Sequence, residues 1–342
     1  LEAVGRVETG VASQIKVTDE KCFLGFDAYE KVIGAGVDYV LLCTPPVFRG
    51  EHFKAAVGAG KHVFVEKPIA VDPVGVRGFL ETAAEAEKKK LGVMAGTVFR
   101  HQTTHREAIA QIHSGEFGEV RGGTSYYNVG YIRNYPRQAG WSDLEYQIRN
   151  WWYFTWLSGD LIVEQAMHRM DITNWIMKGP PVSAYGMGGR QVRVDPAFGN
   201  VYDHFAVEYE YAGGVKVANQ CRQIDGCDPR VTEYYAMSGG VMLEPSKGAR
   251  TGERKAGESL GLAYVREHRD LIESVRRGEP VNEGRQVAES TLTAMMGRMS
   301  AYTGRLVTWE EAMGSELDLR PKGELKFGAM SVRGVAMPGE RG

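Results

Sequence analysis

Apolar and polar residues follow a regular order over residues 1–100. Residues 38–44 are a continuous apolar run, which is typical of a strand buried on both faces. Residues 51–60 place Phe53 and Val57 at helical spacing and end on a glycine. Apolar runs at 60–65 and 93–99 flank a helix that begins with Asp72 as N-cap and Pro73 as its first residue. This order predicts a parallel sheet with right-handed helical crossovers, an α/β domain.

Beyond Phe99 the pattern changes to a block of strands followed by a block of helices. Residues 119–127, 201–211 and 214–224 have strand character, and a hairpin turn at Ala212–Gly213 joins the last two. Residues 264–277 and 284–302 carry helical stripes. This segregation predicts an α+β domain with helices over one face of a sheet. We expect residues 243–262 to form a mobile surface loop and the tail after Leu319 to wrap a neighbouring subunit.

Composition limits the class of protein. The 342 residues are 43% hydrophobic and 25% charged with a formal net charge of −2, which is typical of a globular protein with two domains. No basic patch indicates nucleic acid, and no run approaches the length of a transmembrane helix. The four cysteines show no Cys-x-x-Cys spacing, and we interpret them as unpaired structural thiols, with Cys43 inside a buried strand.

The sequence Glu66-Lys67-Pro68 directly follows the second predicted strand and is the first candidate for chemistry. Ligands of open α/β sheets bind beyond the carboxyl ends of the strands. A lysine at this position can reach a bound substrate, and the proline fixes the turn that directs it. The alternative is a surface turn that happens to hold these residues.

A second candidate lies at 158–171. In a helix, Glu164, His168 and Asp171 fall at i, i+4 and i+7 on one face, and titratable groups that face inward together indicate a shared site. A solvated polar face is the alternative. A zinc site is a third interpretation, but no third ligand is evident and we expect no metal.

Several of these residues together resemble a known family. Thr44-Pro45, His52, Gly60-Lys61-His62-Val63 and Glu66-Lys67-Pro68 are similar in type and spacing to the Gfo/Idh/MocA group, named for glucose–fructose oxidoreductase, inositol dehydrogenase and rhizopine catabolism. The resemblance implies a Rossmann domain over residues 1–100 and a second domain with a large, mostly antiparallel sheet over 101–342. It also implies NAD or NADP as cofactor, held by the residues Thr44, Pro45, His52, Glu66 and Lys67.

The start of the chain departs from the family pattern. Family members open with a strand and a Gly-x-Gly-x-x-Gly/Ala loop, whereas this chain starts at Leu1–Gly5 in what resembles the helix after the second strand. Gly34-Ala35-Gly36 is no substitute, because it ends a helix. We therefore expect an N-terminally truncated Rossmann domain. The alternative is a protein that has lost cofactor binding.

The resemblance also implies roles in the site. Inositol-dehydrogenase-like members carry Asp-x-x-x-His where this chain has Glu164 and His168, so Lys67, His168 and Glu164 become the expected catalytic residues. Glutamate in place of aspartate moves the carboxylate by one methylene. Aromatic rings concentrate at 141–156, where they either stack on sugar faces or build a core. The substrate contacts expected from these segments are Tyr127, Arg149, Trp152, Asp171 and His204.

Three functions remain open at this stage. The first is an NAD(P)-dependent oxidoreductase acting on a carbinol of a sugar or cyclitol, with His168 as base. The second is a glycosidase that recycles NAD and needs an extra base, for which Tyr126, Tyr127 or His204 are available. The third is a non-catalytic sugar-binding or regulatory protein. We also expect a cytoplasmic homo-oligomer, assembled through the open face of the sheet, with neither nucleic-acid nor membrane partners.

Overall fold

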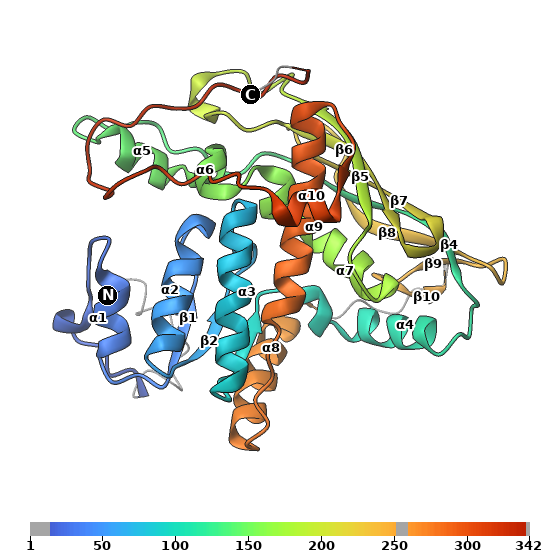
Figure 1. Cartoon of the computed structure of the whole chain (residues 1–342), viewed down its shortest axis with the longest axis horizontal. Coiled ribbons are helices and arrows are strands. Elements are labelled where there is room, and N and C mark those ends of the chain that lie inside the picture. The colour runs from blue at the N-terminus through green and yellow to red at the C-terminus, as the bar shows by residue number, and fades with distance from the viewer. Residues whose placement is uncertain (1–13, 251–258, 340–342) are drawn as a thin grey trace.

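The first half of the molecule is built on a three-stranded parallel sheet (Figure 1). The computed structural model describes residues 14–250 and 259–339. Its first elements are, in chain order, α1 (Ala28–Gly34), β1 (Tyr39–Leu42), α2 (Pro46–Gly58), β2 (His62–Val65), α3 (Pro73–Lys88) and β3 (Val93–Ala95). The predicted α/β order is confirmed, while the expectation about Leu1–Gly5 lies outside the described residues.

Local sequence explains where these helices begin. The Asp72 side chain accepts a hydrogen bond from the backbone N–H of Gly75 at 2.7 Å and caps α3 as predicted. Helix α2 begins at Pro46, five residues before the predicted start, because proline is favoured at the first helical position. Strand β3 is shorter than predicted, since the chain turns into a 3₁₀ helix at Val98–His101.

The prediction that residues 38–44 are buried on both faces is wrong. Leu41 is 53% exposed, and Cys43 is exposed as well. Within the described residues β1 is the edge strand of its sheet. Helix α8 (Leu260–Arg276) packs on the second face at β2 and β3, where Leu271 contacts Phe64 and Met94, and it reaches β1 at Tyr39, whose hydroxyl lies 3.0 Å from Nδ1 of His268. Farther along this edge strand, at Leu41, more than half of the side chain stays exposed.

The second half contains an eight-stranded sheet in the order β10-β9-β8-β4-β7-β6-β5-β11. Strands β4 and β7 pair in parallel, and every other neighbouring pair is antiparallel, as the resemblance implied. The strands are β4 (Val120–Val129), β5 (Ser183–Gly189), β6 (His204–Tyr211), β7 (Val215–Gln223), β8 (Arg230–Met237), β9 (Met242–Glu244), β10 (Gly248–Arg250) and β11 (Val307–Thr308).

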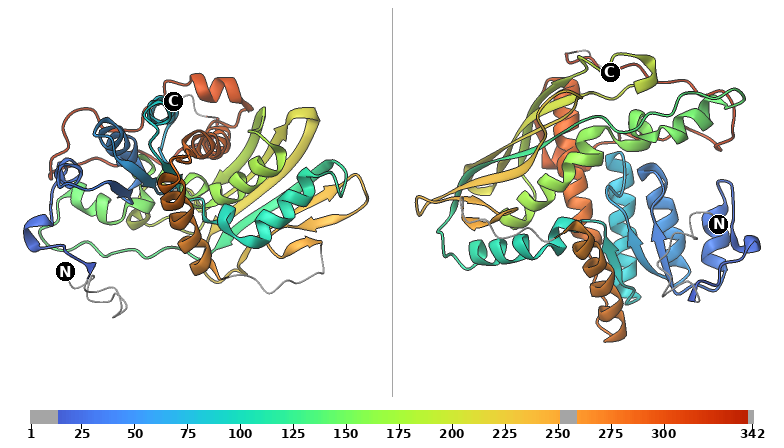
Figure 2. Two further views of the ribbon diagram at one scale, coloured as in Figure 1. Left: turned by 90° about the horizontal axis from the view of Figure 1, so that it is seen from below. Right: turned by 180° about the vertical axis from the view of Figure 1, so that it is seen from behind.

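Helices cover only one face of the large sheet (Figure 2). These helices include α7 (Met167–Met177), which packs on β4 and β7, and α9 (Gly284–Thr303), which packs on β5 and β6. The opposite face is open, and Tyr185 and Met187 on it are 55% and 68% exposed. The remaining helices are α4 (Thr103–His113), α5 (Asp143–Arg149), α6 (Thr155–Ser158) and α10 (Trp309–Gly314).

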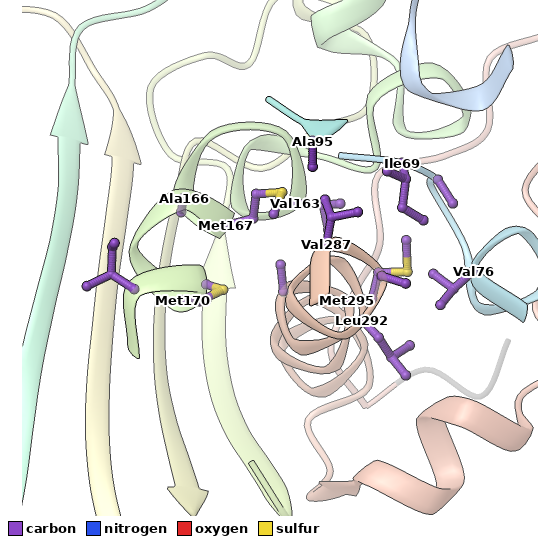
Figure 3. Packing of buried hydrophobic residues seen from close by; sticks show 14 of the residues in the cluster. Ile69, Val76, Ala95, Val163, Ala166, Met167, Met170, Val287, Leu292 and Met295 are labelled. Atoms are coloured by element: carbon purple, nitrogen blue, oxygen red, sulfur yellow. The ribbon is translucent and has the colours of Figure 1, made fainter. Parts of the chain in front are cut away.

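Helix α9 joins the two halves into one core. Figure 3 shows Val287, Leu292 and Met295 of α9 between Ile69 and Val76 on one side and Met167 and Met170 of α7 on the other. All of these side chains are at most 1% exposed. Because α8 and α9 follow the large sheet in sequence but pack against the small one, the domain boundary at residue 100 stays a prediction.

Three segments differ from their predicted form. Residues 158–171 are not one helix, because Gly159 and Asp160 have positive φ and a π-helical turn at Ile162–Ala166 precedes α7. The described part of 243–262 contains β9, β10 and the start of α8 rather than a loop, and Leu243 is fully buried. Residues 251–258 lie outside the described residues.

The C-terminal tail packs against its own chain. The N–H of Leu319 donates to Asp72, the side chain of Gln147 donates to the carbonyl of Met330, and the hydroxyl of Tyr202 donates to the carbonyl of Ala336. Figure 1 shows this segment crossing over α6 and α5. The tail thus packs on its own chain, and its contact with a neighbouring subunit stays a prediction. No described helix has the length and apolarity needed to cross a membrane.

Candidate active site

Lys67 lies just beyond the carboxyl end of β2, where a buried arginine holds the backbone in place. The Lys67–Pro68 peptide bond is cis. Arg49, only 3% exposed, donates to the carbonyl oxygens of Glu66 at 3.2 Å and Pro68 at 2.7 Å, and its Nε donates to the carbonyl of Thr44 at 2.7 Å. Burial lowers the pKa of Arg49 to about 10, so the side chain stays charged at neutral pH. Arg49 therefore clamps the ends of β1 and β2 together.

The Lys67 ammonium group binds Glu164. It donates to the backbone carbonyl of Glu164 and, at 3.1 Å, to carboxylate Oε1. The two side chains are only 11% and 8% exposed. The second oxygen, Oε2, is buried and has no partner among the described residues. Buried polar atoms are rarely left unpaired, and a catalytic role is one of the accepted explanations when they are.

His168 lies beside this pair and is oriented by aromatic rings. The Phe99 ring is perpendicular to the imidazole, with the ring centres 5.1 Å apart, and Tyr127 lies nearly parallel to it at 6.4 Å. Neither ring nitrogen of His168 has a hydrogen-bond partner in the described parts of the chain. Burial, and then the charges of Lys67 and Arg169, hold the pKa of His168 well below its ordinary value. The imidazole is therefore neutral at physiological pH and able to accept a proton.

Tyr127 completes the cluster from the inner face of β4. Burial raises the pKa of its phenol, and the negative charge of Glu164 adds to the effect. A neutral phenol can donate a hydrogen bond to a ligand. The structure thus brings four predicted residues together from three separate segments: Lys67, Tyr127, Glu164 and His168.

Two predicted substrate contacts are occupied by other partners. Asp171 forms a buried ion pair with Arg100, whose Nε lies 2.8 Å from its carboxylate, and accepts a further hydrogen bond from Ser290 at 2.8 Å. Arg149 pairs with Glu145 at 2.9 Å on the surface of α5. These interactions engage the carboxylate of Asp171 and two guanidinium nitrogens of Arg149, so neither residue enters the function proposed below.

The strand register places two other candidates away from the cluster. His204 pairs across the sheet with Gly189 and Arg222, on the open face, and its Nδ1 lies 2.7 Å from Asp203. Tyr126 alternates with inward-facing Tyr127 and lies under the guanidinium group of Arg230 at 4.1 Å. Two of the three extra bases available to a recycling glycosidase are therefore on the wrong side of the sheet.

Trp152 belongs to an aromatic pair. Its ring stacks on Trp151 at 4.3 Å, and both side chains are half-buried. Trp156, by contrast, is buried and donates its indole N–H to Gln147 at 2.7 Å. The tryptophan-rich segment is thus in part a core, and the role of Trp152 in substrate binding stays a prediction.

Three of the expected cofactor residues line one cavity of about 400 Å³. Thr44, Pro45 and His52 form its wall together with apolar side chains of α1 and β1. Nδ1 of His52 lies 3.2 Å from the Thr44 hydroxyl, its ring stacks on Tyr29 at 4.2 Å, and burial lowers the pKa of His52 to about 4. A neutral, mostly apolar wall that also carries the hydroxyl groups of Thr44 and Tyr29 suits the rings and ribose of a dinucleotide.

Glu66 and Lys67 lie at the end of the neighbouring strand rather than in this cavity. A Cβ atom added at Gly96 would come within 2.5 Å of the Glu66 carboxylate, so the ends of β2 and β3 approach closely because residue 96 is glycine. The carboxyl ends of the three strands thus form one continuous edge. The residues present fit a nicotinamide cofactor along that edge. Among residues 14–250 and 259–339, no group of three or more His, Cys, Asp or Glu side chains has the arrangement of a metal site.

Sequence reasoning missed the residues that hold this site from behind. Arg49 stands in the helical stripe of Phe53, Ala56 and Val57, so its position on the buried face of α2 was readable from spacing. Arg169 follows His168 directly and gave no signal, because its partner Glu233 is far away in sequence.

Comparisons with known proteins agree with this architecture. Residues 6–96 match a model described as an oxidoreductase family with an NAD-binding Rossmann fold, and residues 105–232 match the GFO/IDH/MocA C-terminal domain. Inositol 2-dehydrogenase of Rhizobium meliloti is 26% identical over 214 residues, which are 61% of this chain and 58% of that protein. Myo-inositol 2-dehydrogenase of Thermotoga maritima is 25% identical over 308 residues, 84% of each chain.

Solved structures share the fold. Scyllo-inositol dehydrogenase of Lactobacillus casei, with bound NAD(H) and scyllo-inositol, superposes with a TM-score of 0.63 at 17% identity, over 82% of this chain and 83% of that one. A probable dehydrogenase from Thermotoga maritima gives 0.65 at 18% identity over 84% of each chain. With both halves of the chain matched in sequence and in structure, the chain belongs to the Gfo/Idh/MocA oxidoreductase family.

Proposed function

We propose that the chain is an NAD(P)-dependent oxidoreductase that acts on a carbinol of a sugar or cyclitol. The observation that carries the proposal is the convergence of the Lys67–Glu164 pair with neutral His168 at the carboxyl end of β2. The inositol dehydrogenases among the relatives support the substrate class, although the sequence identity to them is low.

Each residue of the Lys67 cluster has a separate role in the proposed oxidation of an alcohol. Thr44, Pro45 and His52 would hold NAD or NADP, which would supply the hydride acceptor. Neutral His168 accepts the proton of the substrate hydroxyl as the carbinol carbon gives up its hydride. The Lys67 ammonium group orients that oxygen and stabilises the negative charge that develops on it. Glu164 holds the ammonium group through two oxygen atoms, and Tyr127 offers a hydroxyl donor to the substrate.

The positions of Tyr126 and His204 support the dehydrogenase over the recycling glycosidase. Elimination across C1 and C2 of an oxidised sugar needs a base near C2, and only Tyr127 of the three candidates faces the cluster. Assembly through the open face of the large sheet remains part of the proposal, and exposed Tyr185 and Met187 there are consistent with it.

An activity assay separates these reactions. The protein is incubated with NAD or NADP and a set of cyclitols and free sugars, and reduced nicotinamide is followed by absorbance. In parallel, nitrophenyl glycosides are tested for aglycone release in deuterated water. The proposal predicts reduction stoichiometric with substrate and no aglycone. Release of aglycone without net reduction, together with exchange of the C2 proton, would establish the glycosidase instead.

A further inference from the structure

A buried ion pair lies directly behind His168. Arg169 and Glu233 are 1% and 0% exposed, and a guanidinium nitrogen of Arg169 donates to one carboxylate oxygen of Glu233. The other oxygen accepts the N–H of Ser246 at 2.8 Å and lies 3.2 Å from Nε2 of His105. The positive charge of Arg169 and the hydrogen bond from His105 hold the pKa of Glu233 at about 2 against the effect of burial. The pair is therefore fully charged and well fixed at neutral pH.

Arg169 also lies across an aromatic ring of the site. Its guanidinium carbon is 4.1 Å from the centre of the Phe99 ring, a close cation–π contact. Phe99 in turn makes a perpendicular ring contact with His168, with the ring centres 5.1 Å apart. A row of contacts thus runs from Glu233 through Arg169 and Phe99 to His168.

His168 depends on packing for its orientation. A catalytic base is usually oriented by a hydrogen bond to a third group. Within the described residues His168 has no such bond, and Phe99 and Tyr127 are the rings that enclose it. A displaced Phe99 ring would therefore change the packing that orients the imidazole.

We propose that Arg169, fixed by Glu233, is a positioning residue that orients the His168 imidazole through the ring of Phe99. The inference rests on the proposed function, in which His168 is the base. The competing explanation is that the ion pair only ties α7 to β8. Thr173 and Tyr235 provide a second tie between the same two elements, with their hydroxyl groups 2.7 Å apart, and give a matched control.

The test compares Arg169→Met/Glu233→Gln with Phe99→Leu and with all three substitutions together. The double variant removes both charges, so no buried charge is left unpaired, and glutamine keeps an acceptor for Ser246. We expect kcat to fall about 10- to 100-fold with KM little changed, because a small misplacement of a reacting group has an effect of this order. Phe99→Leu should give a similar loss, and the triple variant should lose no more than either. Thr173→Val should lower only the melting temperature.

An NMR titration of His168 in the protein without cofactor or substrate provides a test that does not depend on turnover. Lys67, Arg169 and Tyr127 face the imidazole, and loss of the Arg169 charge should raise its pKa and change its ring contacts to Phe99. The acid limb of kcat/KM should move to higher pH by the same amount. An unchanged pKa and kcat with only a lower melting temperature, or additive losses in the triple variant, would overturn the inference. An inactive wild-type protein with the NMR shift present would instead count against the proposed function alone.

Discussion

Lys67 is the residue on which the proposed chemistry depends most. Its ammonium group has two oxygen partners, both from Glu164, and it sits where a parallel sheet directs a ligand. Its charge also contributes to keeping His168 neutral. In the proposed function this side chain orients the substrate oxygen, and its charge adds to the burial that keeps the base neutral.

Replacement of Lys67 by methionine should reduce kcat by at least about 100-fold, the lower range for loss of a positioned acid–base group. Methionine matches the unbranched side chain up to Cε but removes the ammonium group, and with it the charge and the donor. We expect near-ultraviolet circular dichroism to match the wild type. Lys54→Met, on the exposed surface of α2, is the control and should leave kcat unchanged. Full activity of a folded Lys67→Met protein would remove Lys67 from the mechanism.

His168→Asn should affect mainly the rate of the reaction, and Asp171→Asn should affect mainly the stability of the fold. His168→Asn removes the base and should lower kcat about 100-fold or more, with little effect on melting. Asp171→Asn weakens the buried pair with Arg100 and should lower the free energy of unfolding by about 3 kcal/mol while kcat changes far less. Denaturant unfolding and initial rates measure the two effects. A larger fall in kcat for Asp171→Asn would mean that this helix face is assigned incorrectly.

At the scale of elements, the loops after β1 and β2 are held by Arg49. Arg49→Met leaves the carbonyl groups of Thr44, Glu66 and Pro68 without this donor and should lower stability by about 1–3 kcal/mol. We expect kcat to fall as well, because Lys67 lies between two of these carbonyl groups. Arg77→Met is the control, since Arg77, in the second turn of α3, also donates to two backbone carbonyl groups, but those of Met313 and Ser315 near the C-terminal tail. Equal kcat in the two variants would contradict the clamp.

The local sequence pattern predicted the helices and strands, but it could not predict which residues pair with partners distant in the sequence. The strand before Lys67, the cap at Asp72 and the helix at 284–303 follow from spacing and capping rules. The exposure of Leu41 depends on which strand is at the edge, and the partners of Asp171 and Arg169 come from elements more than 60 residues away. The motif therefore located Lys67, Glu164 and His168 but not what holds them in place.

At the scale of the whole molecule, stability should depend on pH through Glu267 on α8. Both of its carboxylate oxygens are buried without a partner in the described part of the structure, and burial, with the charges of Glu66 and Glu283, raises its pKa to about 9. The folded protein thus binds a proton that the unfolded chain releases near pH 4.5. The protonated Glu267 therefore makes its full contribution to the free energy of unfolding below pH 4.5, and this contribution is lost as the pH rises toward 9.

Glu267→Gln tests this dependence. Glutamine cannot ionise, so the variant should be more stable than the wild type at pH 8–9 and nearly equal to it at pH 5. Between these pH values, the free energy of unfolding of the wild type should fall relative to that of the variant by up to about 1.4 kcal/mol per pH unit. Thermal melting across pH, with Glu279→Gln as an exposed control, measures it. Parallel curves for wild type and Glu267→Gln would show that Glu267 ionises normally in the folded state.

The most direct test of the proposed oxidoreductase is a single turnover with the wild type, Lys67→Met and His168→Asn. Dinucleotide affinity is first measured by calorimetry, and reduced nicotinamide is then followed after mixing with a cyclitol or sugar that the activity assay identifies. The account predicts that all three proteins bind the dinucleotide and that only the wild type reduces it rapidly. A wild-type protein that binds no dinucleotide, or variants that reduce it as fast as the wild type, would contradict the account.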